Sequence, residues 1–393
     1  MNSMKLVFVF DGLQVGGIER VGIDYIKLLI ERGHHVSVVN VNPSLNTLYH
    51  QLPEICKIYE LKLPRAMVPY RYAKGVEYGV LGAFAYAGVS AALIVTNTGH
   101  KIISRHELSK LRDTDVVIAF SGHFNDLMFV ASGYIPGKKI AWLHGAEFEY
   151  KIISDGYFAL YRKIKNLVCL SELCDITCKK FNEENGVRKE LIYNPILIQD
   201  KEIDENIVAD LRKKYGNFVL MAGRLAPDKD QKTAILAIKH LSEMRGETVH
   251  LLLAGDGINR DMLENFLKEQ GAEKYVHFLG NCFDMENYYS AAHVYVHSSP
   301  MEGLPTVLLE AMAYGIPIAA TDSIPGVREI LGNNQCGMIS PVGDWKALGE
   351  NIGRLFDEDD LRIKYIKAGE ERIKDFAPDI AINKLEDYIA SIE

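Results

Sequence analysis

The sequence has few cysteines and no spacing in which they would form a disulfide framework. Six are spread over 393 residues, which does not fit a small disulfide-bonded extracellular domain. The opening stretch, MNSMKLVFVFDG, contains too short an apolar run for a secretory signal. These absences predict a protein of a reducing cytoplasm.

The sequence also lacks the excess of positive charge that is typical of nucleic-acid binding. Residues 1–195 contain 23 Lys and Arg against 19 Asp and Glu, or +4, and the remainder contains 21 against 33, or −12. The acidic second half argues against nucleic acid as the main partner. The mildly positive first half fits either an anionic membrane or phosphorylated acceptor, or an ordinary solvated surface.

What the sequence does have is a regular alternation of strand and helix patterns. The first β-α-β unit consists of the strand KLVFVF, a glycine loop, a helical stretch ending at Gly33 and the strand HHVSVVNV. A second series begins at NFVLMAG and continues to CGMISP. The pattern predicts the α/β class with two doubly wound, Rossmann-like domains. A chain of this length is also large enough for two cores.

The predicted domain boundary lies near Asn194 to Asp204, where the apolar rhythm gives way to the polar run QDKEIDEN. The predicted domains are residues 1–195 and 196–370. A C-terminal helix, 371–393, is expected to pack back toward the first domain. Ligands of open parallel sheets bind beyond the carboxyl ends of the strands, so the loops after the strands are the candidate site.

The first of these loops, Asp11 to Gly17, ends in two glycines before a helix. Gly16 and Gly17 let the backbone approach an anion closely, and the helix start supplies free N–H groups. A plain strand-to-helix turn fits the same residues, and the spacing is not the G-x-G-x-x-G of dinucleotide enzymes. The loop alone leaves both interpretations open.

Two cations follow the strand NFVLMAG. Arg224 comes directly after it and Lys229 five residues later. The planar fork of an arginine and the point charge of a lysine can together neutralise a diphosphate without a metal. Structural salt bridges to Asp228 or Asp230 are the alternative. Gly255-Asp256-Gly257, after another strand, is only a weak turn signal.

The most informative stretch is SSPMEGLPTVLLEAMAYGIP, residues 298–317, which has two glutamates in otherwise apolar surroundings. Burying Glu302 and Glu310 is costly unless they meet charged or hydroxyl-rich partners. Residues 303–306 begin a helix whose free N–H groups suit phosphate oxygens. Glu310 lies about one turn further, where it can accept hydrogen bonds from a ribose diol. The stretch predicts a nucleotide-sugar site, and carboxylates satisfied by backbone or arginine are the alternative.

Together these segments resemble family 4 of the retaining, nucleotide-sugar-dependent glycosyltransferases. The resemblance spans essentially the whole chain, from VGGIER through AGRL, AGDG and HFLG to SSPMEGLPTVLLEAMAYGIPIAATD, and the E-x7-E spacing is its most specific part. It implies the GT-B fold, in which two Rossmann-like domains face each other across a cleft. Residues 1–195 would then bind the acceptor, and residues 196–370 the nucleotide sugar.

The resemblance also implies residue roles in the second domain. Glu310 would bind the donor ribose, and Arg224 and Lys229 would stabilise the departing diphosphate. The donor sugar and phosphates would be held by Glu302 and the backbone of Gly303, Leu304, Pro305 and Thr306. Family members commonly have glycine where this chain has Asp230, so an acidic side chain is expected beside Lys229.

In the first domain the resemblance assigns three residues to the donor. Gly16 and Gly17 would line the phosphate side of the cleft. His144, in AWLHG at a strand end, would contact the donor sugar near the reacting carbon. With Glu302, Arg224 and Lys229, it completes the implied catalytic set.

The implied reaction transfers a hexosyl group with retention at the anomeric carbon, and neither a metal nor another cofactor is expected. Two D-x-D patterns match those of metal-dependent transferases, but Asp113-Thr-Asp115 runs directly into a strand and Asp228-Lys-Asp230 adjoins two cations. Cys169, Cys174 and Cys178 do not have a usual zinc spacing.

One segment lies outside the strand-helix rhythm. Residues 78–95, YGVLGAFAYAGVSAALIV, carry no charge and nearly reach the ~20 residues that span a bilayer. Three glycines and a position inside a Rossmann-like domain argue against insertion. A core helix or an apolar wall of the acceptor cleft is one interpretation, and contact with a membrane surface or lipid-linked acceptor is another. The nearby cations that favour contact are Arg65, Arg71, Lys74, Lys101 and Arg105.

The sequence therefore predicts a hexosyltransferase that uses a nucleotide diphosphate sugar, with UDP as the family's default, and a glycan or lipid-linked acceptor. Bacterial surface polysaccharide or glycoconjugate synthesis is the expected context, in the cytoplasm or at the inner face of the cell membrane. A nucleotide-sugar 2-epimerase of the same architecture and a non-catalytic glycan- or nucleotide-binding subunit are the alternatives. Base contacts are expected from residues 281–285, and acceptor contacts from residues 60–110.

Overall fold

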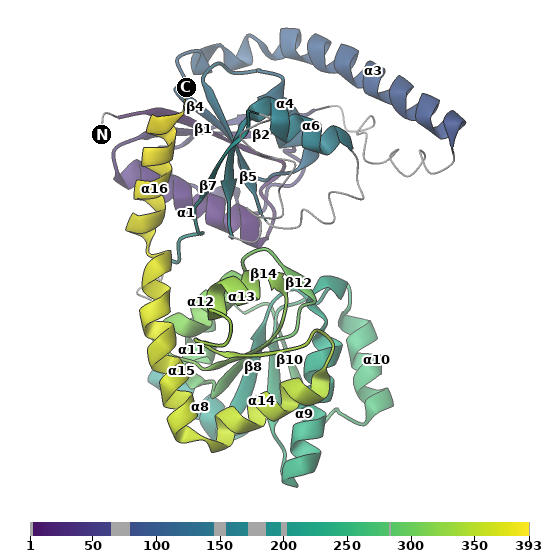
Figure 1. Ribbon diagram of the computed structural model, residues 1–393, viewed down its shortest axis with the longest axis vertical. Helices are drawn as coiled ribbons and strands as arrows, with labels where there is room; N and C mark the ends of the chain where they lie inside the picture. Colours follow the sequence, from purple (N-terminus) through teal and green to yellow (C-terminus); the bar gives the residue numbers. More distant parts are fainter. Residues whose placement is uncertain are drawn as a thin grey trace. The chain divides into compact units, whose positions relative to one another are not determined.

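The computed structural model describes residues 3–63, 79–144, 155–171, 186–197, 203–282 and 284–392. The chain divides into two compact units (Figure 1). Unit 1 consists of Met1–Pro195 and Pro378–Glu393, and unit 2 of Ile196–Ala377. The contact boundary between unit 2 and the C-terminal segment thus lies at Ala377 rather than at residue 370, because the last helical turns before it pack on unit 2.

Unit 1 is built on a seven-stranded parallel sheet in the order β3-β2-β1-β4-β5-β6-β7. Its strands are β1 Lys5–Phe10, β2 His35–Asn40, β3 Lys57–Glu60, β4 Val116–Ala119, β5 Lys138–Leu143, β6 Asn166–Cys169 and β7 Arg188–Leu191. β1 is the predicted strand KLVFVF, and five of its six residues are buried because helices cover both faces of the sheet. The strand order reverses between β1 and β4, which makes that point the expected ligand position.

The α-helices described in unit 1 are α1 Gly17–Glu31, α3 Val80–Ser104, α4 Phe124–Ala131, α6 Asp155–Ile164 and α16 Pro378–Ser391. Short 3-10 turns lie at η1 Tyr49–Gln51 and η4 Glu107–Leu111. α16 is fixed to α1 and its C-cap region by charged contacts: Nε2 of His34 lies 2.8 Å from Oε1 of Glu386, and Nη2 of Arg32 lies 2.7 Å from Oδ1 of Asp379. His34 is buried and therefore has a structural role.

Unit 2 has a six-stranded parallel sheet in the order β10-β9-β8-β11-β13-β15. Its strands are β8 Phe218–Ala222, β9 His250–Ala254, β10 Val276–Gly280, β11 Val294–His297, β13 Ile318–Thr321 and β15 Met338–Ser340. A separate parallel pair joins β12 Met301–Glu302 to β14 Ile324–Pro325. Here the strand order reverses between β8 and β11.

The α-helices described in unit 2 are α8 Glu205–Tyr215, α9 Gln231–Arg245, α10 Arg260–Gln270, α11 Met285–Ala291, α12 Thr306–Ala313, α13 Gly326–Leu331, α14 Trp345–Asp357 and α15 Asp359–Arg372. The 3-10 turns are η6 Pro227–Lys229 and η7 Ile373–Phe376. Leu251, Val294 and Ala319 from the sheet pack with Ile238 of α9 and Ile352 of α14 in the core of this unit. The predicted α/β class with two doubly wound parallel sheets is confirmed.

The uncharged segment that stood outside the rhythm forms most of α3. Leu81, Phe84 and Val95 are 83%, 73% and 71% exposed, so these residues are not part of a core. Of the cations predicted beside the segment, Arg65, Arg71 and Lys74 lie outside the described residues. In the described part of the chain, no helix has both the length and the apolar character needed to cross a membrane.

Candidate functional site

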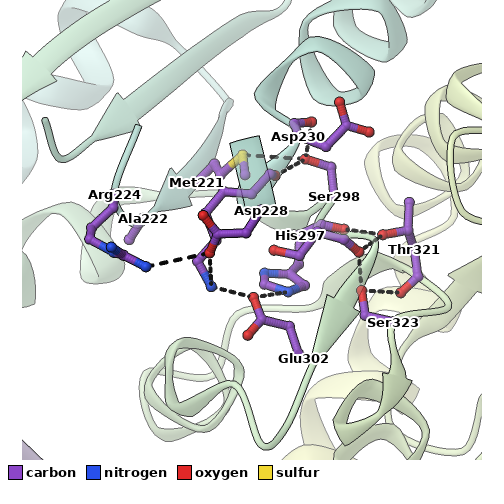
Figure 2. A network of polar contacts seen from close by, with 12 residues as sticks. Met221, Ala222, Arg224, Asp228, Asp230, His297, Ser298, Glu302, Thr321 and Ser323 are labelled. Atoms are coloured by element: carbon purple, nitrogen blue, oxygen red, sulfur yellow. Dashed lines mark hydrogen bonds and ion pairs between the residues drawn. The ribbon is translucent and has the colours of Figure 1, made fainter. Parts of the chain in front are cut away.

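The loops after β8, β11 and β13 of unit 2 bring together several of the residues predicted to hold the donor (Figure 2). β8 and β11 are neighbours at the point where the strand order reverses, the position at which sheets of this kind bind ligands. Lys229 follows β8 and Glu302 follows β11, so parallel pairing brings together residues 73 positions apart in the sequence.

Glu302 is the centre of a buried cluster of charges (Figure 2). Nζ of Lys229 donates to Oε1 of Glu302 at 2.6 Å, and Nε2 of His297 lies 3.4 Å from the same oxygen. The second distance is longer than that of a good hydrogen bond, and both ring nitrogens of buried His297 lack a hydrogen-bond partner in the described structure.

Burial by itself would raise the pKa of Glu302, since only 13% of its side chain is exposed. The neighbouring His297, followed by Lys229, outweighs that effect and lowers the pKa to about 2. Glu302 is therefore an ionised carboxylate throughout the neutral range. His297 was not singled out in the sequence, because a histidine at the end of an apolar strand gives no sign of a partner outside that strand.

The charge of Lys229 is already balanced by carboxylates. Besides Glu302, Oδ2 of Asp228 lies 3.6 Å from its Nζ. Asp230, expected beside this lysine, instead accepts a 2.6 Å hydrogen bond from Oγ1 of Thr233. It has φ 42°, ψ 52° at the start of α9. The acidic neighbour of Lys229 is thus Asp228, with which it forms one of the salt bridges considered from the sequence. The contact of Lys229 with a diphosphate stays a prediction.

Arg224 has a different environment, because its side chain is 67% exposed. Its closest carboxylate contact is Nη2 to Oδ2 of Asp228 at 3.5 Å, a surface ion pair of little energetic value. The backbone beneath it is fixed, since Nε2 of buried Gln231 donates to the carbonyl of Arg224 at 2.8 Å. The guanidinium can therefore turn toward a ligand while its loop stays in place.

The weak turn signal Gly255-Asp256-Gly257 supports that same loop. The amide of Leu225 donates to the carbonyl of Asp256 at 3.0 Å. A Cβ at Gly255 would overlap the carbonyl oxygen of Gly223, and one at Gly257 would lie 2.5 Å from that of Leu225. Glycine at both positions allows the two loops to touch backbone to backbone.

Buried hydroxyl groups tie the β11 loop to its neighbours (Figure 2). Oγ of Ser298 donates to the carbonyl of Asp230 at 2.8 Å, and Oγ1 of Thr321 donates to that of Ser299 at 2.9 Å. Ser323 also donates to the Ser299 carbonyl. These contacts hold the segment that leads to Glu302 against the loops after β8 and β13.

Glu310 projects from α12 and is oriented by a tyrosine from α11. The hydroxyl of Tyr289 donates to Oε2 of Glu310 at 2.7 Å, and its ring stacks on Tyr314 with centroids 5.4 Å apart. Burial, then the charge of Glu310, raises the pKa of Tyr289 well above its usual range, so this hydroxyl stays a donor. No described residue donates to Oε1, which can accept from a ligand hydroxyl. Tyr289 was missed because its helix is short and its partner lies 21 positions away.

The predicted phosphate seat is the start of α12. Leu304 and Pro305 are buried, Gly303 and Thr306 are half-buried, and Pro305 caps the helix without a side-chain hydrogen bond. The first N–H groups of a helix have no partner within it. Glu302 stands before this helix start and Glu310 about one turn after it, as the spacing predicted.

In unit 1 the predicted glycines lie at the start of α1, where a carboxylate is already present. Gly16 is the N-cap residue in extended conformation, and a Cβ there would overlap Oε2 of buried Glu19. Glu19 occupies the third helical position, where glutamate balances the positive end of a helix. Gly17 has open space around it. The packing of Glu19 therefore explains the glycine at position 16. Contacts of Gly16 and Gly17 with a phosphate stay a prediction.

His144 lies at the end of β5 beside Phe120. Its Nε2 is 2.6 Å from the carbonyl oxygen of Phe120, which can only accept, so Nε2 carries the proton. Burial lowers the pKa of His144 to about 4, and the ring is neutral at neutral pH. The contact of His144 with a donor sugar stays a prediction.

A further polar cluster stands where the strand order of unit 1 reverses. Nδ2 of Asn125 lies 3.1 Å from both carboxylate oxygens of Asp11, and Nδ1 of His123 lies 3.9 Å from Oδ2. Asp11 follows β1, and the other two follow β4. Asp11 and Asn125 are 114 positions apart, so only the register of the sheet brings them together.

The D-x-D patterns are engaged by protein groups rather than grouped as metal ligands. Asp113 pairs with Lys5, Asp228 with the two site cations and Asp230 with Thr233. Across the described part of the chain, no three His, Cys, Asp or Glu side chains are placed to hold a metal ion. Cys169 is buried, whereas Cys174 and Cys178 fall outside the described residues.

Comparison with known proteins bears on the fold. Residues 202–372, nearly all of unit 2, match the family model of glycosyl transferases group 1. The solved glycosyltransferase of Rickettsia africae is 18% identical with a TM-score of 0.75, and the match covers 100% of both chains. The HepE protein of Anabaena, solved with UDP and glucose, is 19% identical with a TM-score of 0.72, covering 99% of this chain and 100% of that one. The fold is GT-B.

One curated relative aligns with this chain over nearly its full length. It is the Campylobacter jejuni "GalNAc-alpha-(1->4)-GalNAc-alpha-(1->3)-diNAcBac-PP-undecaprenol alpha-1,4-N-acetyl-D-galactosaminyltransferase", 24% identical over 375 residues, or 95% of this chain and 94% of the relative. The family match and this relative support the glycosyltransferase family. They do not test the assignment to family 4 or the roles of individual residues.

Proposed function

We propose that this protein is a retaining glycosyltransferase that moves a hexosyl group from a nucleotide diphosphate sugar to a glycan or lipid-linked acceptor. The observation that carries the proposal is the arrangement around α12 in unit 2. An oriented carboxylate, Glu310, stands on one side of the helix start, and the buried Glu302–Lys229 pair stands on the other. The match to glycosyl transferases group 1 covers this whole arrangement.

Each part of the donor has chemistry that suits one part of this site. Oε1 of Glu310 can accept from a ribose hydroxyl, and the N–H groups at the start of α12 can hold phosphate oxygens. Exposed Arg224 can turn to the diphosphate as negative charge develops on it. A uridine diphosphate is the proposed nucleotide, supported by the resemblance and by the UDP bound in the Anabaena structure.

Lys229 acts in this proposal as the partner that keeps Glu302 ionised and oriented. Its amino group can also reach a phosphate oxygen if a bound diphosphate competes with Glu302. Retention at the anomeric carbon follows from the resemblance to family 4, and the anomeric configuration of the product, read by proton NMR, tests it. Gly16, Gly17 and His144 remain proposed donor contacts from unit 1.

We propose that the reaction needs no metal ion. The carboxylates of both D-x-D patterns are engaged by cations, by a hydroxyl group or, for Asp115, by the backbone N–H of Lys5, and fixed cations can stabilise the leaving diphosphate in place of a metal. Transfer measured after exhaustive chelation, with and without added magnesium or manganese, is expected to proceed at the same rate. Loss of transfer on chelation, with recovery on adding either ion, would contradict this part of the proposal.

Product analysis distinguishes transfer from the two alternatives. The protein is incubated with UDP-, GDP- and ADP-sugars and a mixture of lipid-linked and free glycan acceptors, and nucleotides and sugars are separated by chromatography. A transferase releases nucleoside diphosphate and glycosylates an acceptor. A 2-epimerase converts the donor without any acceptor, and a binding subunit leaves every donor unchanged. Either of the last two results, obtained with a donor that binds, would refute the proposed reaction.

The proposed biological setting is bacterial polysaccharide or glycoconjugate synthesis at the inner face of the cell membrane. The Campylobacter relative is named for an undecaprenol-linked substrate, and the sequence predicts a lipid-linked or glycan acceptor. Unit 1 is the proposed acceptor-binding unit.

A further inference from the structure

His297, the last residue of β11, is a buried histidine that uses neither of its ring nitrogens. Its side chain is 3% exposed, and neither Nδ1 nor Nε2 has a hydrogen-bond partner among the described residues. Buried polar atoms are nearly always paired, because an unpaired one has lost its contacts with water without replacement. The backbone holds the ring in place, since His297 pairs with Ala320 of β13 and Ser298 donates to the carbonyl of Asp230. An unpaired imidazole in a fixed position calls for a partner.

The polar group nearest to this ring is the carboxylate of Glu302. Figure 2 shows the ring of His297 facing Glu302, and Nε2 lies 3.4 Å from Oε1. Hydrogen bonds of the N–H···O kind span about 2.7–3.2 Å, so a small turn of the carboxylate would complete this one. In the free protein that turn is opposed by Lys229, whose Nζ holds the same oxygen at 2.6 Å. His297 and Lys229 thus compete for one oxygen of Glu302.

The proposed donor also competes for Lys229. The ammonium group of Lys229 lies beside two carboxylates, with Oε1 of Glu302 at 2.6 Å and Oδ2 of Asp228 at 3.6 Å, and its side chain is 21% exposed. The phosphate oxygens of a bound diphosphate would add further negative charge that attracts this cation. Any movement of Lys229 toward a phosphate weakens its hold on Glu302, which is only 13% exposed. A buried carboxylate that loses its cation is costly unless another donor replaces it.

We propose that His297 is a positioning residue that holds Glu302 when the diphosphate of the donor draws Lys229 away. In the free protein Glu302 pairs with Lys229, and in the donor complex Nε2–H of His297 donates to Oε1 instead. A carboxylate only accepts, so this contact requires the ring tautomer with its proton on Nε2. The exchange keeps the carboxylate before α12 in one place while the lysine contacts phosphate. This inference rests on the proposed function, because a diphosphate is what attracts Lys229.

Removing Lys229 tests the exchange without any nucleotide, because it leaves Glu302 with His297 alone. His297→Leu is expected to change the midpoint of thermal unfolding by about 2 °C or less in the wild type, where the ring is unpaired. In Lys229→Met the same substitution should lower the midpoint by about 4–8 °C, the effect of losing one hydrogen bond to a charged group. His297→Gln should restore most of that loss, because its amide nitrogen can donate from nearly the position of Nε2.

The matched control is His293→Leu. His293 lies just before β11, at the opposite end of the strand from His297, and its partly buried ring contacts Arg362 rather than Glu302. Its substitution is expected to shift the unfolding midpoint equally in the wild type and in Lys229→Met. The control therefore separates coupling to Glu302 from a general disturbance of β11.

Nucleotide titration tests the donor-bound side of the exchange. UDP, GDP and ADP are titrated into wild type, His297→Leu and His297→Gln by calorimetry. Of the nucleotides that the wild type binds, His297→Leu should bind each about tenfold more weakly, and His297→Gln within about threefold of wild type. In protein with ¹⁵N-labelled histidine, the signal absent from His297→Leu identifies His297. Adding the nucleotide should move the Nε2 proton of His297 downfield, as a new hydrogen bond requires.

Two groups of results would overturn the exchange. The first is an equal effect of His297→Leu with and without Lys229, an unchanged Nε2 signal on adding a nucleotide that binds, or a loss in His297→Gln as large as in His297→Leu. These results leave the proposed function in place. The second is a wild-type protein that binds none of the three nucleotides, which contradicts the proposed function and the exchange together, whatever the unfolding midpoints show.

Discussion

Replacing Arg224 by alanine is expected to lower kcat by ~10²–10³-fold, the loss typical of removing one preorganised donor to a developing oxyanion. The side chain is exposed and makes only a 3.5 Å contact with Asp228, so it gives little stability to the free protein. Its loop is held by the Gln231 hydrogen bond and by the glycine contacts beneath it. The substitution should therefore remove a charge from the diphosphate site without moving the backbone.

The matched control for Arg224 is Arg354→Ala. The side chain of Arg354 is 50% exposed, against 67% for Arg224, and it also pairs with a carboxylate four positions later, Glu358, but it lies on α14. Initial rates are measured at saturating donor for both variants, with thermal unfolding as the check of folding. Arg224→Ala should lose transfer and keep stability, whereas Arg354→Ala should keep both. Equal rates in the two variants would contradict the assignment of Arg224 to the diphosphate site.

Replacing Lys229 by methionine is expected to destabilise unit 2 by about 3–5 kcal/mol, the range found when one partner of a buried ion pair is removed. Glu302, which has only 13% of its side chain exposed, then loses its closest cation, and the ring of His297 at 3.4 Å is its remaining polar neighbour. Transfer should also fall, because the carboxylate before α12 is no longer held. Thermal unfolding and initial rates measure the two effects on the same samples.

A double-mutant cycle identifies the cause of that loss. Lys229→Met with Glu302→Gln should recover much of the stability, because the neutral amide leaves no unpaired charge. Lys239→Met is the control, since Lys239 is also partly buried and pairs at 3.7 Å with Glu243 outside the site. If Lys229→Met lowers the free energy of unfolding no more than Lys239→Met does, the Lys229–Glu302 pair contributes no more stability than the control pair.

The stability of the folded protein is expected to fall at acid pH because of Glu302. The pKa of Glu302 is lowered from its ordinary value of 4.5 to about 2, so its ionised form stabilises the folded state above pH 4.5. That contribution is lost as the pH falls from 4.5 toward 2. In Glu302→Gln this part of the acid-induced destabilisation should be absent.

The elements of the fold follow from local patterns that a single sequence contains. KLVFVF and NFVLMAG are continuous apolar runs, and each becomes a buried strand followed by a loop that contains predicted site residues. The E-x7-E spacing likewise places Glu302 and Glu310 around one helix start, since a helix start fixes the distances on both sides of it. These features are short-range in sequence.

The contacts that define the chemistry are long-range, and the sequence did not predict them. His297 meets Glu302 across a turn, Tyr289 meets Glu310 from a different helix, and Lys229 meets Glu302 from 73 positions away. Each depends on strand order and side-chain direction, which a single sequence leaves open. The sequence left a salt bridge of Lys229 to Asp228 or Asp230 open, but it did not predict the closer pair with Glu302.

The central claim is that a nucleoside diphosphate binds at the start of α12, with Glu310 on its ribose. Calorimetric titration of UDP, GDP and ADP into wild type, Tyr289→Phe and Glu310→Ala tests it directly. The wild type should bind at least one of the three. Glu310→Ala should bind that nucleotide about 10–100-fold more weakly, as expected for losing hydrogen bonds to a charged group, and Tyr289→Phe should lose less. Equal affinity in wild type and Glu310→Ala, or no binding of any of the three by wild type, would contradict the claim.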